Sequence, residues 1–309
     1  MARSRFPADA GLSTRMLLTM FLLGLVYVAF VAVLIAVHVP VVLVILIAGG
    51  FLFFQYFFSD RIALFAMRAQ EVTPQQAPEL HAIVDRLCAL ADMPKPRVAI
   101  ADSDIPNAFA TGRNQKAAVV CATTGILRRL DEPELEAVLA HELSHVAHRD
   151  VAVMTIASFL GLLAGFVVRS AIYAGAYGGF GGGYGRDRDD RDNTGAVILL
   201  VVLASAVVYA LSFLLTRALS RYRELSADRS GAILIGRPSL LASALVKVTG
   251  DMSRIPTRDL RAAEPLNAFF FTPALSAGFS LSSLFATHPS LERRLEQLSR
   301  LEQQLGRPS

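Results

Sequence analysis

Two histidines and a glutamate in the segment His141-Glu142-Leu143-Ser144-His145 have the types and the spacing of a metal-dependent hydrolytic site. Histidines four positions apart lie on one face of a helix, one turn apart, so both imidazoles can reach one ion. Zinc suits imidazole nitrogen, and a glutamate beside the first histidine can act as a general base. The pattern also arises by chance, as two solvated histidines on a helix surface. It therefore favours a zinc hydrolase over that alternative without excluding it.

A catalytic zinc site typically has three protein ligands and one open position, so a third ligand must come from elsewhere in the chain. The apolar runs that follow the histidine pair predict a hairpin of two helices. Its arms, from His145 to Tyr177 and from Gly195 to Glu224, are nearly equal in length. Because each helical residue rises by the same amount, Glu224 returns to the level of His145. We therefore predict that His141, His145 and Glu224 bind one Zn²⁺ per chain.

Asp228 lies four residues beyond Glu224 and hence on the same face of the predicted helix. Its carboxylate can hold the outer nitrogen of a ligating histidine and fix the tautomer of the ring. The alternative for Glu224 is an exposed carboxylate that pairs with Arg221 or Arg223. The matched arm lengths and the presence of Asp228 favour the metal site.

The elements that must position these residues include four long apolar runs. Hydrophobic residues make up 53% of the 309 residues, and the mean hydropathy is +0.47. A hydrocarbon core of about 30 Å is crossed by about 20 helical residues. A soluble protein would need an unusually large core to bury four such helices. We therefore predict a multi-pass membrane protein with four transmembrane helices, at about 16–37, 41–58, 151–168 and 196–215.

Basic residues near the span ends indicate the orientation, because they favour the cytoplasmic side. Arginines precede the first span and follow the second and the fourth, which places all of them on one side. The first apolar run is longer than the hydrophobic part of a signal peptide, and we interpret it as a retained anchor. The prediction is a protein of the cell inner membrane whose catalytic domain faces the cytoplasm.

The polar parts predict a fold that is mainly α with a small β-sheet. Helical spacing runs from Pro78 to Asp92, short β-branched runs at 97–101 and 117–122 indicate strands, and 107–116 is typical of an edge strand with a turn. Asp131 predicts the cap of the helix that carries the histidines and continues into the third span. The predicted parts are a transmembrane hairpin 1–60, a first catalytic part 61–150, a second hairpin 151–216 with a Gly/Asp/Arg-rich loop 177–195, and a second catalytic part 217–309.

Charge and cysteine content give little evidence for other partners. The net charge of +4 is explained by the arginines that flank the spans, so it indicates no nucleic-acid partner. The chain has two cysteines, Cys88 and Cys121, without a paired motif that would indicate a second metal site. A cytoplasmic location predicts that both stay reduced. Nothing in the sequence indicates the oligomeric state.

Four ordered motifs resemble those of the HtpX-type membrane metallopeptidases, which are related to the CAAX prenyl proteases. They are Asn107-Ala108-Phe109-Ala110-Thr111-Gly112, the segment 141–145, Ser220 to Asp228, and Thr287-His288-Pro289. The resemblance covers nearly the whole chain and implies a zincin-like catalytic domain. It also implies site residues: zinc ligands His141, His145 and Glu224, general base Glu142, a substrate-pairing strand with Asn107, Ala108 and Phe109, and His288 near the reacting carbonyl.

Two features depart from this pattern or stay open. The segment His148-Arg149-Asp150 stands where the family often has asparagine and glycine before the aspartate. We interpret His148 as a surface residue or a partner of a ligand rather than a ligand. The cluster Phe269 to Phe271 could line a substrate groove or contact lipid, but core packing is the favoured interpretation.

The predicted reaction is hydrolysis of peptide bonds in protein substrates, with Glu142 taking the proton of the attacking water. His288 is the predicted donor to the oxyanion, with Tyr222 as a weaker candidate. The resemblance implies quality control of misfolded membrane proteins. Three alternatives remain: a membrane scaffold with a structural zinc, a prenyl-type protease, and a transporter. A transporter normally has ionisable groups inside its spans, and here only Arg169 near a span end could serve.

Overall fold

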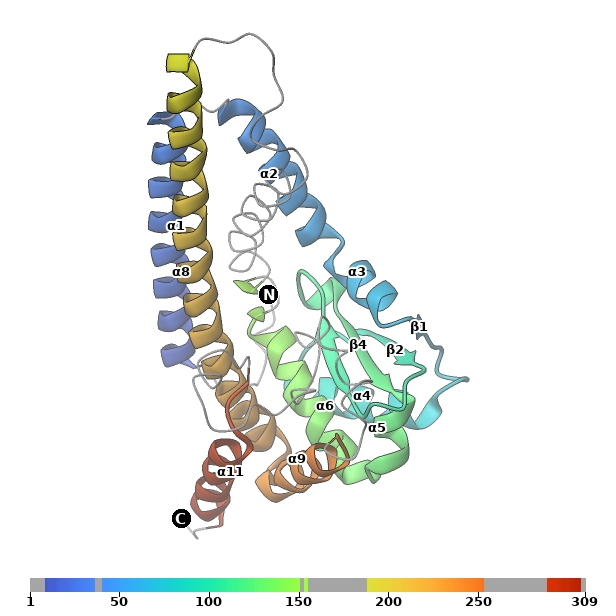
Figure 1. Cartoon of the computed structure of the whole chain (residues 1–309). Helices are drawn as coiled ribbons and strands as arrows, with labels where there is room; N and C mark the ends of the chain where they lie inside the picture. The colour runs from blue at the N-terminus through green and yellow to red at the C-terminus, as the bar shows by residue number, and fades with distance from the viewer. Residues whose placement is uncertain (1–8, 37–40, 151–152, 155–187, 253–287, 307–309) are drawn as a thin grey trace.

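The computed structural model describes residues 9–36, 41–150, 153–154, 188–252 and 288–306. This part of the chain is mainly helical and has one four-stranded sheet, as predicted (Figure 1). The elements are α1 (Ala10–Ala36), α2 (Val41–Phe57), α3 (Ser59–Ala66), β1 (Ala69–Glu71), α4 (Pro78–Ala91), β2 (Arg97–Ala101), β3 (Ala108–Thr111), a 3-10 turn (Gln115–Ala117), β4 (Val119–Thr123), α5 (Thr124–Arg129), α6 (Glu132–Ala147), α8 (Arg188–Ile235), α9 (Pro238–Met252) and α11 (Leu291–Leu305).

Two of the described helices, α1 and α8, are long and apolar enough to cross a membrane. They lie side by side and pack through Leu23, Phe30 and Val208, while only 17% of each apolar window is buried. Helices of a soluble core would be covered on most sides, so this exposure fits contact with lipid. The first and fourth predicted spans thus lie in candidate membrane helices.

The described residues contain two candidate spans rather than the four that the sequence predicts. The second predicted span forms α2, whose 17 residues correspond to about 25 Å, somewhat less than the thickness of the hydrocarbon core. The third predicted span, 151–168, lies outside the described residues apart from Val153 and Met154.

Two predicted boundaries are wrong. Helix α8 begins at Arg188, so the last part of the predicted loop 177–195 is helical. The aspartates at 189, 190 and 192 suit a helix start, because carboxylates near an N-terminus interact favourably with the helix dipole. Helix α6 ends at Ala147 instead of continuing into the third span, and Arg149 follows with a left-handed φ of 60°.

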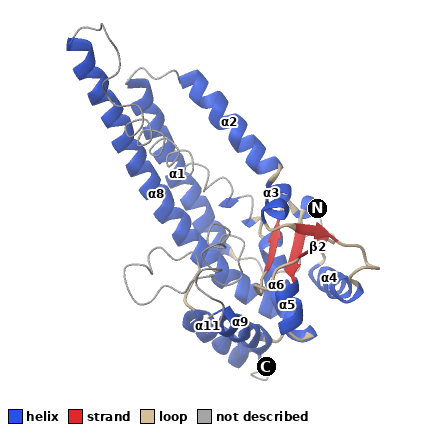
Figure 2. Cartoon of the chain, turned by 45° about the vertical axis from the view of Figure 1, so that its right-hand side comes forward, coloured by secondary structure: helices blue, strands red, loops and turns tan. Residues whose placement is uncertain are grey.

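The sheet has the strand order β1-β2-β4-β3, which leaves β3 at an edge as predicted. The pairs β1/β2 and β3/β4 are antiparallel, whereas β2 and β4 are parallel. One face packs on α4 and α6 in the main apolar core, and α3 covers the other face (Figure 2). The strands β2 and β4 match the predicted runs closely, but the short strand β1 carries no hydrophobic pattern and was not predicted.

Helix α6 is held in place at its start and along its length. Asp131 and Glu134 form a complete capping box, which confirms the predicted cap. Glu134 also accepts hydrogen bonds from Ser243 Oγ at 2.7 Å and Lys247 Nζ at 2.6 Å, which fix α9 against α6. Helix α6 therefore lies buried between the sheet and α9.

Helix α8 crosses α6 at very short range where Gly231 faces His141. A Cβ atom added to Gly231 would lie 2.8 Å from the backbone nitrogen and 2.9 Å from the Cα atom of His141. Real side chains almost never approach so closely, so this position requires glycine. The close crossing lets α8 bring its polar face against the histidines of α6.

We expect Gly231→Ala to lower the melting temperature of the detergent-solubilised protein. Overpacking costs about 1–3 kcal/mol, which exceeds the gain of about 1 kcal/mol in helix propensity. Gly250→Ala on α9 is the matched control, because an added Cβ there meets nothing within 4 Å. A melting temperature of Gly231→Ala at or above that of the wild type would contradict the close crossing.

Candidate metal centre

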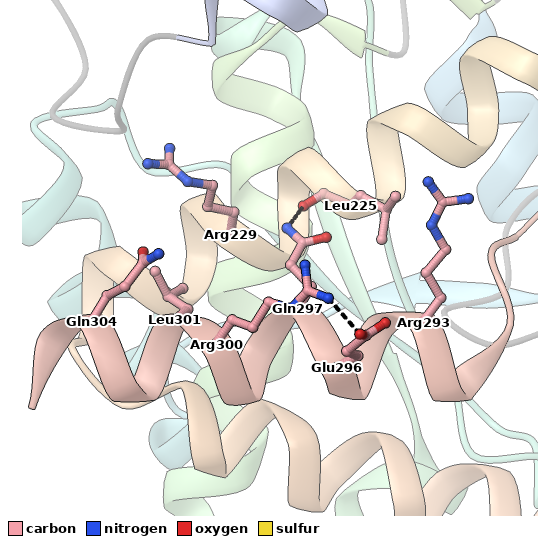
Figure 3. A pocket seen from close by; sticks show the side chains of 8 residues that line it. All are labelled: Leu225, Arg229, Arg293, Glu296, Gln297, Arg300, Leu301 and Gln304. Atoms are coloured by element: carbon pink, nitrogen blue, oxygen red, sulfur yellow. Dashed lines mark hydrogen bonds and ion pairs between the residues drawn. The ribbon is translucent and has the colours of Figure 1, made fainter.

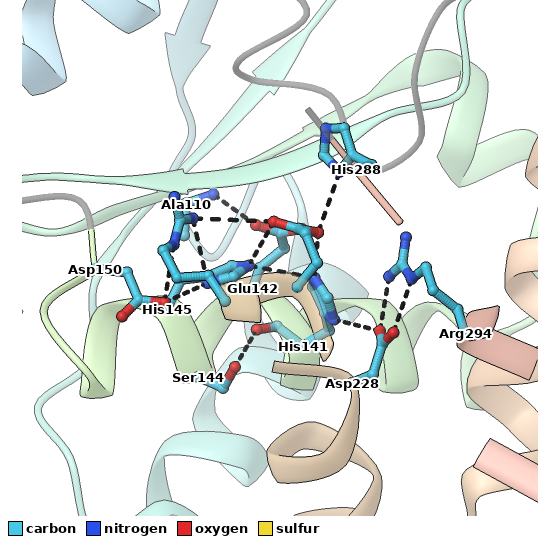
Figure 4. Close-up of polar contacts among 11 residues, drawn as sticks. Ala110, His141, Glu142, Ser144, His145, Asp150, Asp228, His288 and Arg294 are labelled. Atoms are coloured by element: carbon cyan, nitrogen blue, oxygen red, sulfur yellow. Dashed lines mark hydrogen bonds and ion pairs between the residues drawn. The ribbon is translucent and has the colours of Figure 1, made fainter. Parts of the chain in front are cut away.

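The three predicted ligands come together where α8 crosses α6. Figure 4 labels two of them, His141 and His145, among their polar contacts. One donor atom from each of His141, His145 and Glu224 lies within 4.8 Å of the other two. The two Nε2 atoms are 3.3 Å apart, and the Glu224 carboxylate oxygens lie 3.5 Å from His141 Nε2 and 3.6 Å from His145 Nε2. All three side chains are buried. Two imidazoles and one carboxylate are the donor set of many catalytic zinc sites, so these residues fit that metal.

Each histidine has its outer nitrogen against a buried carboxylate. His141 Nδ1 lies 2.9 Å from Asp228 Oδ1, and His145 Nδ1 lies 2.8 Å from Asp150 Oδ2. A carboxylate at Nδ1 favours the tautomer that leaves Nε2 free for a metal, and it raises the basicity of the ring. Both rings are therefore oriented with Nε2 toward a single point.

Two arginines complete these contacts. Arg294 of α11 is buried and donates two hydrogen bonds to Asp228, at 2.7 and 2.6 Å, from Nε and Nη2. Arg223 Nε donates to Asp150 Oδ2 at 3.1 Å. Each histidine thus contacts a carboxylate, and that carboxylate in turn contacts a guanidinium group. The charges of the two buried aspartates are compensated in this way.

The pKa values of the two histidines differ. Burial alone would lower the pKa of His141, but the Asp228 and Glu224 carboxylates outweigh it and raise that pKa to about 9. Burial and then the Arg223 guanidinium lower the pKa of His145. A metal ion must therefore displace a proton from His141, whereas the neutral ring of His145 is ready to bind.

Glu142 points from α6 toward the edge strand β3. Its Oε2 accepts a hydrogen bond from the Ala110 backbone N–H at 3.0 Å, and its side chain is buried. Burial and the nearby Glu224 carboxylate raise the pKa of Glu142 to about 7, although His141 acts in the opposite direction. A carboxylate with a pKa close to neutral is well suited to accept and pass on a proton.

The residues predicted to pair with substrate lie in and before β3, and all three are buried. Asn107 faces the sheet: its backbone N–H donates to Thr123 Oγ1 at 2.9 Å, and its carbonyl accepts from Thr123 N at 2.9 Å. Backbone groups alternate in direction along an antiparallel strand, so Ala108 and Ala110 face the free edge. Of the three residues predicted to pair with substrate, only Ala108 has backbone groups that point away from β4, and it is buried.

His288 lies at the margin of the centre. Its Nδ1 is 3.2 Å from Glu224 Oε2, and its side chain is 6% exposed. The structure thus brings it against a predicted ligand. Tyr222 points away from the centre, because its ring packs under the guanidinium group of Arg15 at 4.2 Å. No contact among the described residues places Tyr222 at the centre, so its role as a donor to the oxyanion stays a prediction.

The sequence left the roles of His148 and of the phenylalanine cluster open. His148 is the half-buried C-cap residue of α6 and does not belong to the cluster of possible metal-binding groups. Phe269 to Phe271 lie outside the described residues.

Sequence reasoning missed Asp150, Arg223 and Arg294. Asp150 comes five residues after His145, a spacing that faces away on a regular helix and works here only because α6 ends at Ala147. Arg223 was considered as a surface partner of Glu224. Arg294 lies six residues after His288, and the motif around that histidine was the one signal that could have pointed to it.

A groove between α8 and α11 lies behind the turn of α8 that carries Glu224 (Figure 3). Gln297 Nε2 crosses it and donates to the backbone carbonyl of Leu225 at 2.7 Å, next to Glu224. Helix α11 therefore supports α8 twice, through Gln297 and through Arg294. The groove contains none of the predicted ligands; it is lined by Leu225, Arg229, Arg293, Glu296, Gln297, Arg300, Leu301 and Gln304.

A buried His-His-Glu cluster beside a glutamate base, on helices joined to membrane-spanning segments, defines the class of membrane metallopeptidases. A model of peptidase family M48 matches residues 74–302. The chain belongs to this family, and the resemblance to the HtpX-type members is confirmed by its relatives.

The relatives match over nearly their full length. Protease HtpX homolog 1 of Streptomyces coelicolor is 60% identical over 304 residues, which cover 98% of this chain and 97% of the relative. A protease HtpX homolog of Moorella thermoacetica is 57% identical over 303 residues, 98% of each chain. The crystal structure of S. mikatae Ste24p is similar in fold, with a TM-score of 0.55 at 16% identity, over 94% of this chain and 67% of Ste24p.

We expect Asp150→Asn to weaken zinc binding by about 10–100-fold, because loss of a carboxylate behind a metal-ligating histidine typically has an effect of this size. Competition with a chromophoric chelator measures the affinity on purified protein. Asp102→Asn, which changes an exposed aspartate on the loop after β2, is the control and should bind like the wild type. Equal affinity for Asp150→Asn and Asp102→Asn would show that the Asp150 contact does not support the metal site.

Proposed function

We propose that this membrane metallopeptidase is a zinc-dependent endopeptidase with His141, His145 and Glu224 as ligands and Glu142 as general base. The observation that carries the proposal is the convergence of three buried donor atoms within 4.8 Å, with both outer histidine nitrogens held by carboxylates. A purely structural zinc site, with Glu224 as a ligand and Asp150 and Asp228 behind the histidines, has no use for a fourth buried carboxylate with a raised pKa. Glu142 therefore favours the enzyme over the scaffold alternative.

The chain's own residues supply most of the chemistry. Zinc, when bound, acts as a Lewis acid for the scissile carbonyl and for water. Glu142, oriented by the Ala110 N–H, takes a proton from the attacking water and delivers it to the leaving amine. His288, beside Glu224, is proposed as the donor to the developing oxyanion. Asp228 holds His141 in the tautomer that binds metal.

Substrate is proposed to bind as an additional strand along β3, in the segment Asn107, Ala108 and Phe109. The unpaired backbone groups of an edge strand can recognise an extended peptide with little regard for its side chains. Asn107 contributes by fixing β3 to β4 through Thr123. Loose specificity suits the removal of misfolded membrane proteins, which is the role we propose. A prenyl-type protease would need additional spans around a chamber.

The proposed topology has four spans, at about 16–37, 41–58, 151–168 and 196–215. The helices α1, α2 and α8 support three of them. The two catalytic parts, 61–150 and 217–309, then lie on one side of the membrane. The arginines at the span ends support the cytoplasmic side.

We expect Glu142→Gln to lower peptide-bond cleavage by about 10²–10⁴-fold, the range for loss of a general base. Purified protein is assayed on a membrane-protein substrate, with and without a chelator, and zinc content is measured in parallel. Glu142→Gln should keep its zinc. Glu132→Gln on the same helix, at a 64% exposed side chain, is the control. Cleavage by Glu142→Gln at the wild-type rate would refute the proposed mechanism.

The topology can be read from cysteine labelling in spheroplasts with a membrane-impermeant maleimide. Burial raises the pKa of the Cys88 thiol to about 11 and that of Cys121 to about 12, so the natural cysteines react slowly. We expect Asp190→Cys to be labelled on intact spheroplasts and Gln303→Cys only after lysis. Labelling of Gln303→Cys without lysis would place the catalytic domain outside the cytoplasm.

A further inference from the structure

The short helix α3 has two different faces. Asp60 and Ala63 on the inner face are buried, and Ala63 belongs to an apolar cluster that includes Phe109 of β3. On the outer face, Ile62 and Phe65 are 39% and 86% exposed. Such exposure leaves most of the Phe65 side chain uncovered by the protein.

This exposed face continues from α2, and only Phe58 lies between the end of α2 and the start of α3. Phe54 and Phe57 of α2 are 52% and 40% exposed, and the Phe54 ring stacks on that of Phe58 with 4.9 Å between the ring centroids. The spacing of three or four residues puts the rings of Phe54, Phe57 and Phe58 along one side. Figures 1 and 2 both show α3 at the end of α2, next to the sheet.

Two arginines border the apolar face of α3. The Arg61 guanidinium group lies over the Phe58 ring at 5.6 Å from its centroid, and Arg68 follows the end of the helix. Both side chains are exposed, and within the described ranges neither forms an ion pair. Exposed apolar side chains bordered by guanidinium groups are typical of a segment that lies in a membrane interface.

We propose that α3 lies in the surface of the bilayer, with Ile62 and Phe65 among the outer acyl chains and Arg61 and Arg68 among anionic headgroups. Helix α3 begins at Ser59, directly after the predicted second span 41–58, so it stands at the predicted end of a membrane segment. The partner is a phospholipid surface, because the apolar stripe is continuous with a helix of the membrane part of the protein.

This position fixes the height of the sheet above the lipid. Arg97 of β2 pairs with Asp60 of α3. Arg113, just after β3, donates to the backbone carbonyl of Phe57 at 3.2 Å and lies over its ring at 5.3 Å. Helix α3 is thus a spacer, about 10 Å across, between the bilayer and the edge strand. This placement does not depend on the proposed reaction.

The test uses the absence of tryptophan from the chain. Phe65→Trp introduces one fluorophore into full-length protein, which is reconstituted in phosphatidylcholine–phosphatidylglycerol vesicles. Some vesicles carry acyl chains brominated near the headgroup. Leu90→Trp on α4, at a 43% exposed position on the opposite face of the sheet, is the matched control. Circular dichroism and zinc content show that each variant is folded, and Ile62→Trp on the same face replaces Phe65→Trp if it is not.

We expect the tryptophan of Phe65→Trp to emit at shorter wavelength, to be quenched by the brominated lipid and to resist acrylamide. That of Leu90→Trp should respond to acrylamide alone. Equal acrylamide quenching of the two, without an effect of bromine, would mean that α3 is in water. Protection of Phe65→Trp from both quenchers would mean that protein covers the face, either another segment of this chain or a second copy. Either result overturns the proposal.

Discussion

Most of the structure depends on one constraint, because several charged groups share a single buried site. Burial of an unpaired charge is costly, so each group must be matched by another of opposite sign. Two arginines face four carboxylates here, and the two charges left over correspond to those of one divalent cation. The carboxylates are those of Glu142, Glu224, Asp150 and Asp228, and the guanidinium groups are those of Arg223 and Arg294. Charge balance therefore agrees with the donor set.

This balance explains why distant parts of the chain meet at α6. The helix carries both histidines, but the groups that orient them come from α8, from α11 and from the residue after the turn at Arg149. The close crossing at Gly231 brings α8 near enough for Glu224 and Asp228 to reach the rings. Helix α11 then holds the same turn of α8 from behind. The metal site and the packing of the catalytic domain are thus a single arrangement.

The sequence predicted the parts of the site that follow from helical periodicity. The spacing of His141 and His145, and the position of Asp228 after Glu224, depend only on the geometry of one helix. Asp150 could not be predicted, because its contact needs α6 to end and the backbone to take a left-handed conformation at Arg149. Arg294 depends on how α11 docks onto α8, which no local pattern encodes. Loop and span boundaries were less predictable still, as the early start of α8 shows.

The continuity of α8 has a mechanical consequence. Its 48 residues correspond to about 70 Å without a break, from the aspartate-rich start to the turn below the metal-binding residues. A rod of this kind carries a change of tilt from one end to the other, since no flexible joint absorbs it. Apolar helices tilt to match the thickness of the surrounding lipid. Glu224 and Asp228 stand on the same uninterrupted helix as the apolar part of α8, so no loop separates the carboxylates of the centre from the segment long and apolar enough to cross a membrane.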